Sequence, residues 1–367
     1  DDDQGRTANE ADKTYRVFRL PVRSSITETI RVIPITYKGQ NGFVSSNTGL
    51  ASFMVRLLPI TAFTLTTEAA FAPPSLNQSV LGLLGTGQES FVTMQAVLSE
   101  LDDECARRNG SQSSARTAPK CLGVFPNNLT FRTATGQVVG IAYVGGVSML
   151  TQSVSATDVF SQLSPYGTSH WLDFRALTVA HEYGHLMNLN HAGCGGPTDT
   201  DPRLYPDGRL GGGSGYDTAR EFYFSSQRLN NSGQPQFGDL MSYCTKEWSS
   251  DRSYLAALGY RSGASARVET NSTVGRSQWL KISLQGERWS LRPVDFTPST
   301  LRVTEATLNA SSSQGVTSFP VYAAVIADAP ELTHGPFYVD LGDLNPQSLS
   351  LHGLESLLDK TIQWSAQ

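Results

Sequence analysis

The chain has 367 residues and a formal net charge of −5 at pH 7, with 39% hydrophobic and 17% charged residues. This length predicts two globular domains of ordinary size. The acidic balance and the lack of a Lys/Arg cluster exclude a nucleic-acid partner and an anionic membrane surface, because both require a concentrated basic face. The longest apolar run begins at Leu50 and is interrupted by Arg56 and Pro59, so no membrane span is predicted.

The N-terminal residues and the cysteines point to an oxidising compartment. Residues 1–16 are polar and are expected to form a flexible segment, of the kind that removal of a signal peptide leaves. Four cysteines, Cys105, Cys121, Cys194 and Cys244, allow three pairings. None lies in a CxxC motif, which favours disulfides over zinc-thiolate or redox chemistry. We therefore expect a secreted, extracellular protein.

The first part of the chain alternates between predicted strands and helices, which indicates an α/β domain over residues 17–261. Its last helix is expected at YLAALGY, residues 254–260. In chain order the patterns predict a strand at 29–37, a helix at 48–59, a strand at 62–71, a long helix at 88–109, strands within 120–126 and 140–150, and then a helix carrying HEYGHLMNLNH, residues 181–191.

Residues 262–367 have a different pattern of short strands separated by Gly, Pro, Ser and Asn clusters. This pattern predicts a C-terminal all-β sandwich domain. Its strands are expected within 278–285, 288–296, 301–309, 319–327 and 337–344.

Three of the six histidines lie within eleven positions. His181 and His185 are one helical turn apart and share a face, whereas His191 joins them only if the helix ends first and the chain turns back. A catalytic zinc takes three protein ligands and keeps one position open. Glu182 lies on the flank of the same face, where its carboxylate can act as the general base toward a zinc-activated water. The spacing HExxHxxxxxH therefore predicts a zinc hydrolase.

This motif resembles that of the metzincins, zinc endopeptidases with the signature HExxHxxGxxH and a downstream Met-turn. Asn188 stands at the glycine position, and Asn is the next residue most tolerant of the left-handed conformation that ends the helix. In DLMSYC, residues 239–244, the resemblance makes Met241 the Met-turn residue beneath the zinc ligands. It gives Tyr243 a role in stabilising the oxyanion, although a tyrosine there could instead pack or line the cleft. The resemblance implies a metzincin-like catalytic domain.

One of the three possible cysteine pairings fits this site. A bridge between Cys194 and Cys244 would tie the loop of the third histidine to the Met-turn, and would close a long loop. Cys105 and Cys121 would then pin the long helix to the following strand.

The residues that follow the third histidine, 191–217, together with those around Met241, resemble a branch of secreted metzincins related to mucin-degrading enzymes of enteric bacteria. Asp199, Asp201 and Asp207 lie in this run and are candidate ligands for Ca²⁺ in addition to the catalytic Zn²⁺, the alternative being a solvated loop.

In metzincins an edge strand before the active helix pairs with the substrate backbone. Gly140, Ile141, Ala142 and Tyr143 occupy the corresponding place and are candidate substrate-binding residues. An interior strand is the alternative for the same residues.

These observations predict a secreted, monomeric zinc-dependent endopeptidase that acts on extracellular protein or glycoprotein substrates. Two other classes stay open at this point. One is a glycan- or protein-binding adhesion protein with a vestigial zinc site, which the intact Glu182 argues against. The other is a zinc hydrolase acting on a non-peptide bond.

Overall fold

The computed structural model describes most of the chain from Ile26 to His352. The described residues are 26–77, 88–110, 116–132, 137–155, 174–197, 199–210, 215–217, 222–224, 237–243, 246–262, 279–285, 288–294, 301–313, 315–327, 336–342, 344 and 348–352. The segment 1–16, expected to be flexible, and Cys244 lie outside them. Among the described helices, none combines the length and apolar character that crossing a bilayer requires.

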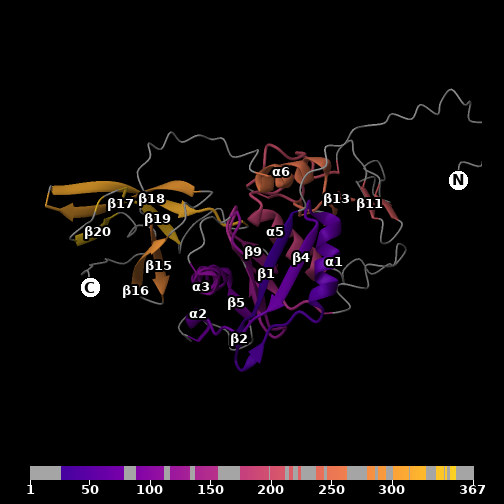
Figure 1. Cartoon of the computed structure of the whole chain (residues 1–367), viewed down its shortest axis with the longest axis horizontal. Helices are drawn as coiled ribbons and strands as arrows, with labels where there is room; N and C mark the ends of the chain where they lie inside the picture. Colours follow the sequence, from indigo (N-terminus) through magenta and orange to yellow (C-terminus); the bar gives the residue numbers. More distant parts are fainter. Residues whose placement is uncertain are drawn as a thin grey trace, which may run out of the picture.

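A five-stranded sheet forms the centre of the first part of the chain (Figure 1). Its order is β4-β1-β6-β10-β9, and every neighbouring pair is parallel except β9 with β10. Every residue of β6 and β10 is buried, as expected for central strands that are covered on both faces. The strands span Thr27–Pro34 (β1), Ala62–Thr67 (β4), Lys120–Phe125 (β6), Gly140–Ala142 (β9) and Ser148–Gln152 (β10).

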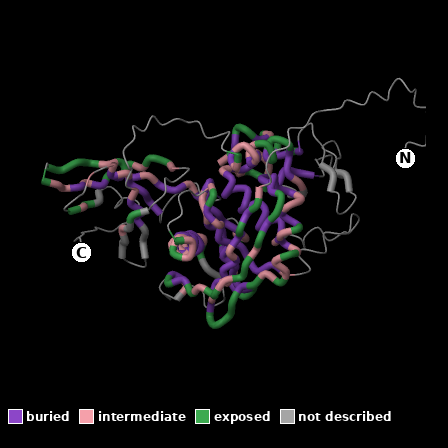
Figure 2. Tube along the Cα trace, viewed as in Figure 1, coloured by how far each residue is buried: buried purple, intermediate pink, exposed green. Residues whose placement is uncertain are grey.

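Helices cover both faces of this sheet. On one face α1 (Asn47–Leu57), α5 (Phe174–Leu186) and α6 (Asp251–Ser262) share a hydrophobic cluster with the inward residues of β1 and β6. On the other face α3 (Phe91–Asn109) packs in a second cluster. Figure 2 shows the buried residues gathered along the central sheet. The expected α/β layering is confirmed.

The ends of the two predicted helices follow local capping chemistry. The Ser90 side chain accepts a hydrogen bond from the Thr93 N–H at the start of α3, and Gly110 ends it with φ 66°. Ser46 caps α1 in the same way. The long helix therefore begins three residues later than the expected Gln88, because Gln88–Ser90 forms the short strand β5.

The remaining short elements described in this part are α2 and four small sheets. They are α2 (Pro74–Asn77), β2 (Thr36–Tyr37) with β3 (Gln40–Asn41), β5 (Gln88–Ser90) with β7 (Thr130–Arg132) and β8 (Gln137–Val138), β11 (Gly215–Asp217) with β12 (Phe222–Phe224), and β13 (Gly238–Asp239) with β14 (Lys246–Trp248).

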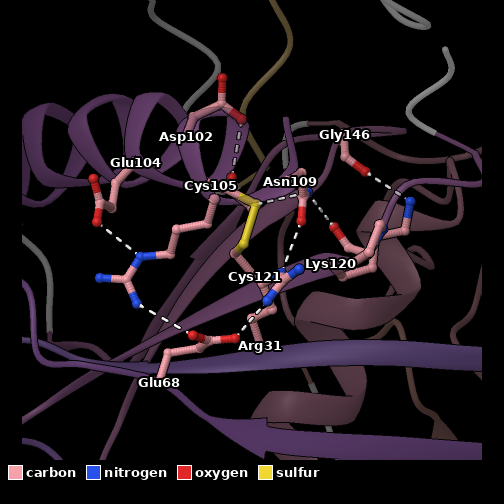
Figure 3. The surroundings of a disulfide bond; sticks show 12 residues. Arg31, Glu68, Asp102, Glu104, Cys105, Asn109, Lys120, Cys121 and Gly146 are labelled. Carbon is pink, nitrogen blue, oxygen red and sulfur yellow. Dashed lines mark hydrogen bonds and ion pairs between the residues drawn. A yellow bond between two sulfur atoms is a disulfide. The ribbon is translucent and has the colours of Figure 1, made fainter. Parts of the chain in front are cut away.

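A disulfide between Cys105 and Cys121 joins α3 to β6, which confirms that expected pairing. Figure 3 shows its surroundings, where the end of α3 is also held by side-chain hydrogen bonds. Asn109 Nδ2 donates to Pro119 O at 2.9 Å, and Arg31 Nε on β1 donates to Asn109 Oδ1 at 2.9 Å. The helix end is therefore fixed to the sheet both covalently and by a polar network.

The C-terminal part forms a six-stranded, wholly antiparallel sheet in the order β16-β15-β19-β18-β17-β20. The second layer that a sandwich needs is not seen among the residues that the structure describes in this region, so the described part is one sheet. Its strands are β15 (Trp279–Gln285), β16 (Arg288–Val294), β17 (Leu301–Ser312), β18 (Gly315–Ala324), β19 (Phe337–Asp340) and β20 (Ser348–His352).

The sheet packs on α3 and shares its hydrophobic cluster, so Leu101 of α3 and Ile282 of β15 belong to one core. Lys281 on β15 is fully buried at this junction, and its Nζ lies 2.7 Å from Asp102 Oδ2 and 2.6 Å from Asp103 Oδ1. Burying the Lys281 ammonium costs desolvation, which its contacts with the two carboxylates offset.

Candidate metal centre

Helix α5 carries His181 and His185 and ends at Leu186, just before the chain turns. Asn188 has φ 64°, in the left-handed region, and its N–H donates to His185 O at 2.8 Å. This turn reverses the chain and returns His191 to the helix face. All three histidines are at most 1% exposed.

The three imidazoles converge through their Nε2 atoms. His185 Nε2 lies 3.1 Å from His181 Nε2, which in turn lies 3.3 Å from His191 Nε2. A tetrahedral zinc with bonds of about 2.05 Å would hold its nitrogen ligands about 3.3 Å apart. The donor set and its spacing therefore fit zinc. Within the part of the chain that the structure describes, this is the one group of three metal-binding side chains.

Each histidine is oriented by an acceptor at its other ring nitrogen. His181 Nδ1 lies 2.7 Å from Leu240 O, His185 Nδ1 lies 2.7 Å from Leu189 O, and His191 Nδ1 lies 2.5 Å from Asp199 Oδ1. An Nδ1–H that donates to these oxygens leaves the Nε2 lone pair toward the centre. The site is thus arranged as a neutral, three-nitrogen ligand set.

Glu182 is 2% exposed and lies between α5 and β9. An ideal Cβ built on Gly140 would lie 2.3 Å from Glu182 Oε1 and 2.6 Å from Thr178 Cγ2. Only glycine at position 140 therefore allows the strand to approach the carboxylate this closely. The contact puts Glu182 beneath the N-terminal end of β9.

Met241 is fully buried under α5. A Cβ on Gly184 would lie 2.4 Å from its Sδ, so the helix approaches the methionine at a glycine, and Met241 O accepts from Ala192 N at 2.9 Å. This contact joins the segment after the third histidine to the segment at Met241.

A buried carboxylate that the sequence reading missed holds this turn. Asp239 Oδ1 accepts from Met241 N at 2.7 Å, and Oδ2 accepts from Ser250 N at 2.9 Å and Ser253 Oγ at 2.7 Å. Burial raises the pKa of Asp239, and these hydrogen bonds oppose the rise. The signal available in the sequence was an aspartate two residues before the methionine, the spacing of an Asx-turn.

Tyr243 lies at the rim of the site, with 38% of its surface exposed. Its ring centroid is 4.4 Å from that of His191 and 6.3 Å from that of His181, and its N–H donates to Cys194 O at 3.0 Å. Cys194 is itself disulfide-bonded, while its expected partner Cys244 lies outside the described residues.

The aspartates considered for calcium have separate partners. Asp199 accepts from His191, Asp201 pairs with Arg203 at 2.6 Å, and Asp207 pairs with Arg209 at 3.0 Å. Among the described residues, these three carboxylates do not come together in one group of possible metal ligands. Asp199 instead orients a zinc-binding histidine, a role that its sequence position alone does not reveal.

A second buried charged group lies behind α5. Lys120 is almost fully buried near Glu28, and its Nζ donates to Gly146 O at 3.5 Å. Figure 3 marks this bond between Lys120 and Gly146. Burial lowers the pKa of Lys120 to about 7, opposed by Glu28, and raises the pKa of Glu28. Arg261 on α6 makes an ion pair with Glu28. Glu28 also interacts with the side chain of Tyr183, which projects from α5 on the side away from His181 and His185.

The four candidate substrate-binding residues lie on β9 or directly after it. Gly140, Ile141 and Ala142 pair antiparallel with β10, and β9 is the last strand in the sheet order. Tyr143 is 4% exposed and forms an isolated antiparallel bridge with Ile326. The structure therefore brings Gly140 to the carboxylate of Glu182 and places Tyr143 against the C-terminal part.

Residues 95–192 match a family model described as metallopeptidase family M12B, reprolysin-like. The match runs from α3 to just past His191 and so includes the whole histidine motif. The metallopeptidase resemblance is confirmed. The match and the three-histidine site together support a zinc-dependent peptidase with protein substrates.

Two solved structures are similar at low identity. One is a zinc-dependent peptidase from Methanocorpusculum labreanum, 18% identical, covering 45% of this chain and 85% of that chain with a TM-score of 0.28. The other is catalytically inactive OgpA from Akkermansia muciniphila in complex with an O-glycopeptide (glycodrosocin) substrate, 12% identical, covering 93% and 87% with a TM-score of 0.28. These values support no statement about substrate. A search of curated proteins found no match.

Proposed function

We propose that the protein is a secreted, monomeric zinc-dependent endopeptidase of extracellular proteins or glycoproteins. The observation that carries this proposal is the convergence of three buried imidazole nitrogens, each with an acceptor at Nδ1, beside a buried glutamate. We assign the catalytic part to residues 17–261, and we take the described antiparallel sheet as one layer of a β-sandwich in residues 262–367. The disulfide between Cys105 and Cys121 supports an oxidising compartment.

The proposed mechanism assigns each step to a residue of this chain. His181, His185 and His191 would hold zinc, which when bound polarises the scissile carbonyl and activates water. Glu182 takes the proton of the attacking water and delivers it to the leaving amine. Tyr243 donates its hydroxyl proton in a hydrogen bond to the developing oxyanion from the rim of the site. Met241, as the Met-turn residue, and Asn188, as the helix cap, keep the histidines in position.

The substrate class follows from the resemblance of residues 191–217 to mucin-degrading enzymes. O-glycosylated protein is therefore the first substrate to compare with unglycosylated protein. Zinc is the one metal that this proposal requires.

The test is cleavage of casein, gelatin and an O-glycosylated mucin with and without a zinc chelator. Glu182→Ala should bind one equivalent of zinc yet lose about 10²- to 10⁴-fold in kcat/KM, the range that general-base catalysis contributes. Glu305→Ala, at an exposed glutamate on β17, is the matched control and should cleave at the parent rate.

Two outcomes would overturn parts of the proposal. Cleavage by Glu182→Ala at the parent rate would remove Glu182 as the base. Zinc binding at one equivalent with no cleavage of any substrate would favour the adhesion protein instead.

A further inference from the structure

A short segment of the C-terminal part pairs with the outer edge of the strand that approaches Glu182. Val144 N donates to Val325 O at 3.0 Å, and Ala327 N donates to Ala142 O at 2.9 Å. Between these bonds, Tyr143 and Ile326 form an antiparallel bridge. Residues 325–327 follow β18 directly and extend the five-stranded sheet beyond β9.

Strand β9 uses its opposite edge for β10. Tyr143 N donates to Ser148 O at 3.3 Å on that side, and Leu150 pairs with Ile141. The edge taken by residues 325–327 is therefore the edge that would be left for a substrate backbone, and the segment runs antiparallel to β9, as an added substrate strand would.

The segment is firmly held rather than loosely laid on the edge. Ile326 is 3% exposed and Ala327 is fully buried, and Ile326 shares a hydrophobic cluster with Ile141 and Tyr143. A substrate strand that displaced the segment would form two hydrogen bonds in place of the two it broke. It would also expose the apolar side chain of Ile326 to water, so replacing the segment by a substrate strand gives no net gain in free energy.

The direction of a substrate strand relative to β9 determines which of its residues, those before or those after the scissile bond, would meet residues 325–327. A substrate antiparallel to β9 has its N-terminal residues opposite Ala142 and beyond, and its C-terminal residues toward Gly140. The catalytic carboxylate lies beneath Gly140. Ala142 is two positions further along β9, which leaves room for roughly two paired substrate residues between Gly140 and the segment.

We propose that residues 325–327 cap the N-terminal side of the substrate cleft, so that substrates pair with β9 over only about two residues before the scissile bond. The substrate class is then a polypeptide that ends, or turns away from the sheet, within that distance: an N-terminal segment or a tight loop. This inference rests on the proposed peptidase function and on β9 as the substrate strand.

The test uses the full-length, zinc-loaded protein and synthetic peptides built on a cleavage site mapped in casein. The peptides share all residues after the scissile bond and carry one, two, four or six residues before it. For the parent, kcat/KM should rise up to two residues and then change by less than about twofold, because no further backbone pairing is available.

Ala327→Pro removes the N–H that donates to Ala142 O and is expected to loosen the cap. In this variant kcat/KM should increase by about tenfold between two and six residues, the equivalent of newly available backbone pairing. Ala327→Gly keeps the N–H and is the matched control, with the length dependence of the parent.

Amide hydrogen exchange gives a second readout that does not depend on turnover. In Glu182→Ala, the Val144 and Ala327 amides should stay protected when the longest peptide binds. Loss of their protection on binding would show that the substrate displaces the segment and would overturn the proposal.

Failure of this inference is distinguishable from failure of the proposed function. A steady rise of the parent's kcat/KM up to six residues, with normal cleavage, overturns the cap alone. Absence of cleavage of every peptide overturns the peptidase assignment, and the cap with it.

Discussion

The metal centre and the junction between α3, β9 and the C-terminal sheet are built in opposite ways. At the metal centre three ligands lie within eleven positions of sequence, and a single turn at Asn188 brings them together. At the junction, Lys281 meets Asp102 across 179 positions. The first region depends on local helix chemistry, whereas the second depends on how distant segments pack.

This difference predicts which property a substitution changes, the stability of the fold or the binding of zinc and turnover. Changes at the junction should weaken the fold and leave the ligand set intact, and changes around the histidines should alter zinc binding or turnover with little effect on folding. Four substitutions, taken from the largest expected effect to the smallest, test this separation.

Lys281→Met should destabilise the fold by about 3–5 kcal/mol, because it leaves the buried carboxylate of Asp102 and the partly buried carboxylate of Asp103 without their cation. Chemical denaturation of the zinc-loaded protein measures the effect. Arg107→Met, at an exposed ion pair with Glu104, is the control and should leave the unfolding midpoint unchanged. Equal stability of Lys281→Met and the parent would show that the junction does not depend on this ion pair.

Gly140→Ala should lower kcat by about 10²-fold while the zinc affinity stays at the parent value. The new Cβ would enter the space of Glu182 Oε1 and move the carboxylate, which lies where the two regions meet. Gly39→Ala is a matched control, since a Cβ there meets no atom within 4 Å, although its φ of 76° adds local backbone strain. A parent-like kcat for Gly140→Ala would mean that turnover does not depend on the position of the Glu182 carboxylate.

Asp199→Asn should weaken zinc binding by about 10- to 100-fold, because the acceptor of the His191 Nδ1–H loses its charge. Competition with a chromogenic chelator measures the dissociation constant without relying on activity. Asp207→Asn is the control in the same stretch, since Asp207 pairs with Arg209 and contacts no histidine. An unchanged zinc affinity for Asp199→Asn would mean that His191 is oriented by the fold alone.

Lys120→Met tests the charges behind α5 through pH. The folded-state pKa of Lys120 is about 7, below its ordinary value of 10.5, so the unfolded chain binds more protons between these values and the stability of the parent rises with pH there. The advantage of the variant over the parent should therefore be largest below pH 7. Well between the two pKa values it should shrink by about 1.4 kcal/mol for each pH unit, and it should stop changing above pH 10.5.

Denaturation at several pH values between neutral and alkaline measures this difference. Arg107→Met, whose guanidinium does not titrate in the window, should differ from the parent by a constant amount. A pH-independent difference for Lys120→Met would mean that Lys120 keeps its charge in the folded protein.

Much of the structure around the metal centre could be predicted from the sequence, because the sequence signals for it are local. The strand and helix patterns and the histidine spacing are predicted by the sequence, since both depend on periodicity. The bridge between Cys105 and Cys121 is expected only as the pair that remains once Cys194 is paired with Cys244. Asp199 was read as a candidate calcium ligand. Its contact with His191 depends on a loop conformation that composition does not specify.

For the junction of α3, β9 and the C-terminal sheet, the sequence predicted only the outline of the structure. Alternation predicted strands after residue 262, but one sheet packed on α3 has the same alternation as one layer of a sandwich. Nothing in the residues of Ile326 and Tyr143 marks them as partners, because backbone pairing at a sheet edge depends on position rather than on side-chain type. The proximity of Gly140 to Glu182 could likewise not be predicted, because a glycine in a strand can mark a bulge, a bend or a close approach of another group.

The Asp239 carboxylate has a consequence for how this enzyme can diversify. The chain leaves the metal centre near Cys194 and comes back at Asp239, and its two ends are already joined by the bond from Ala192 N to Met241 O and the bond from Tyr243 N to Cys194 O. Because loop closure costs little more for a longer loop, insertions between these ends are inexpensive. Asp199, which lies in this segment, stays fixed by its contact with His191. A change of loop length away from that contact would leave the zinc ligands in their places.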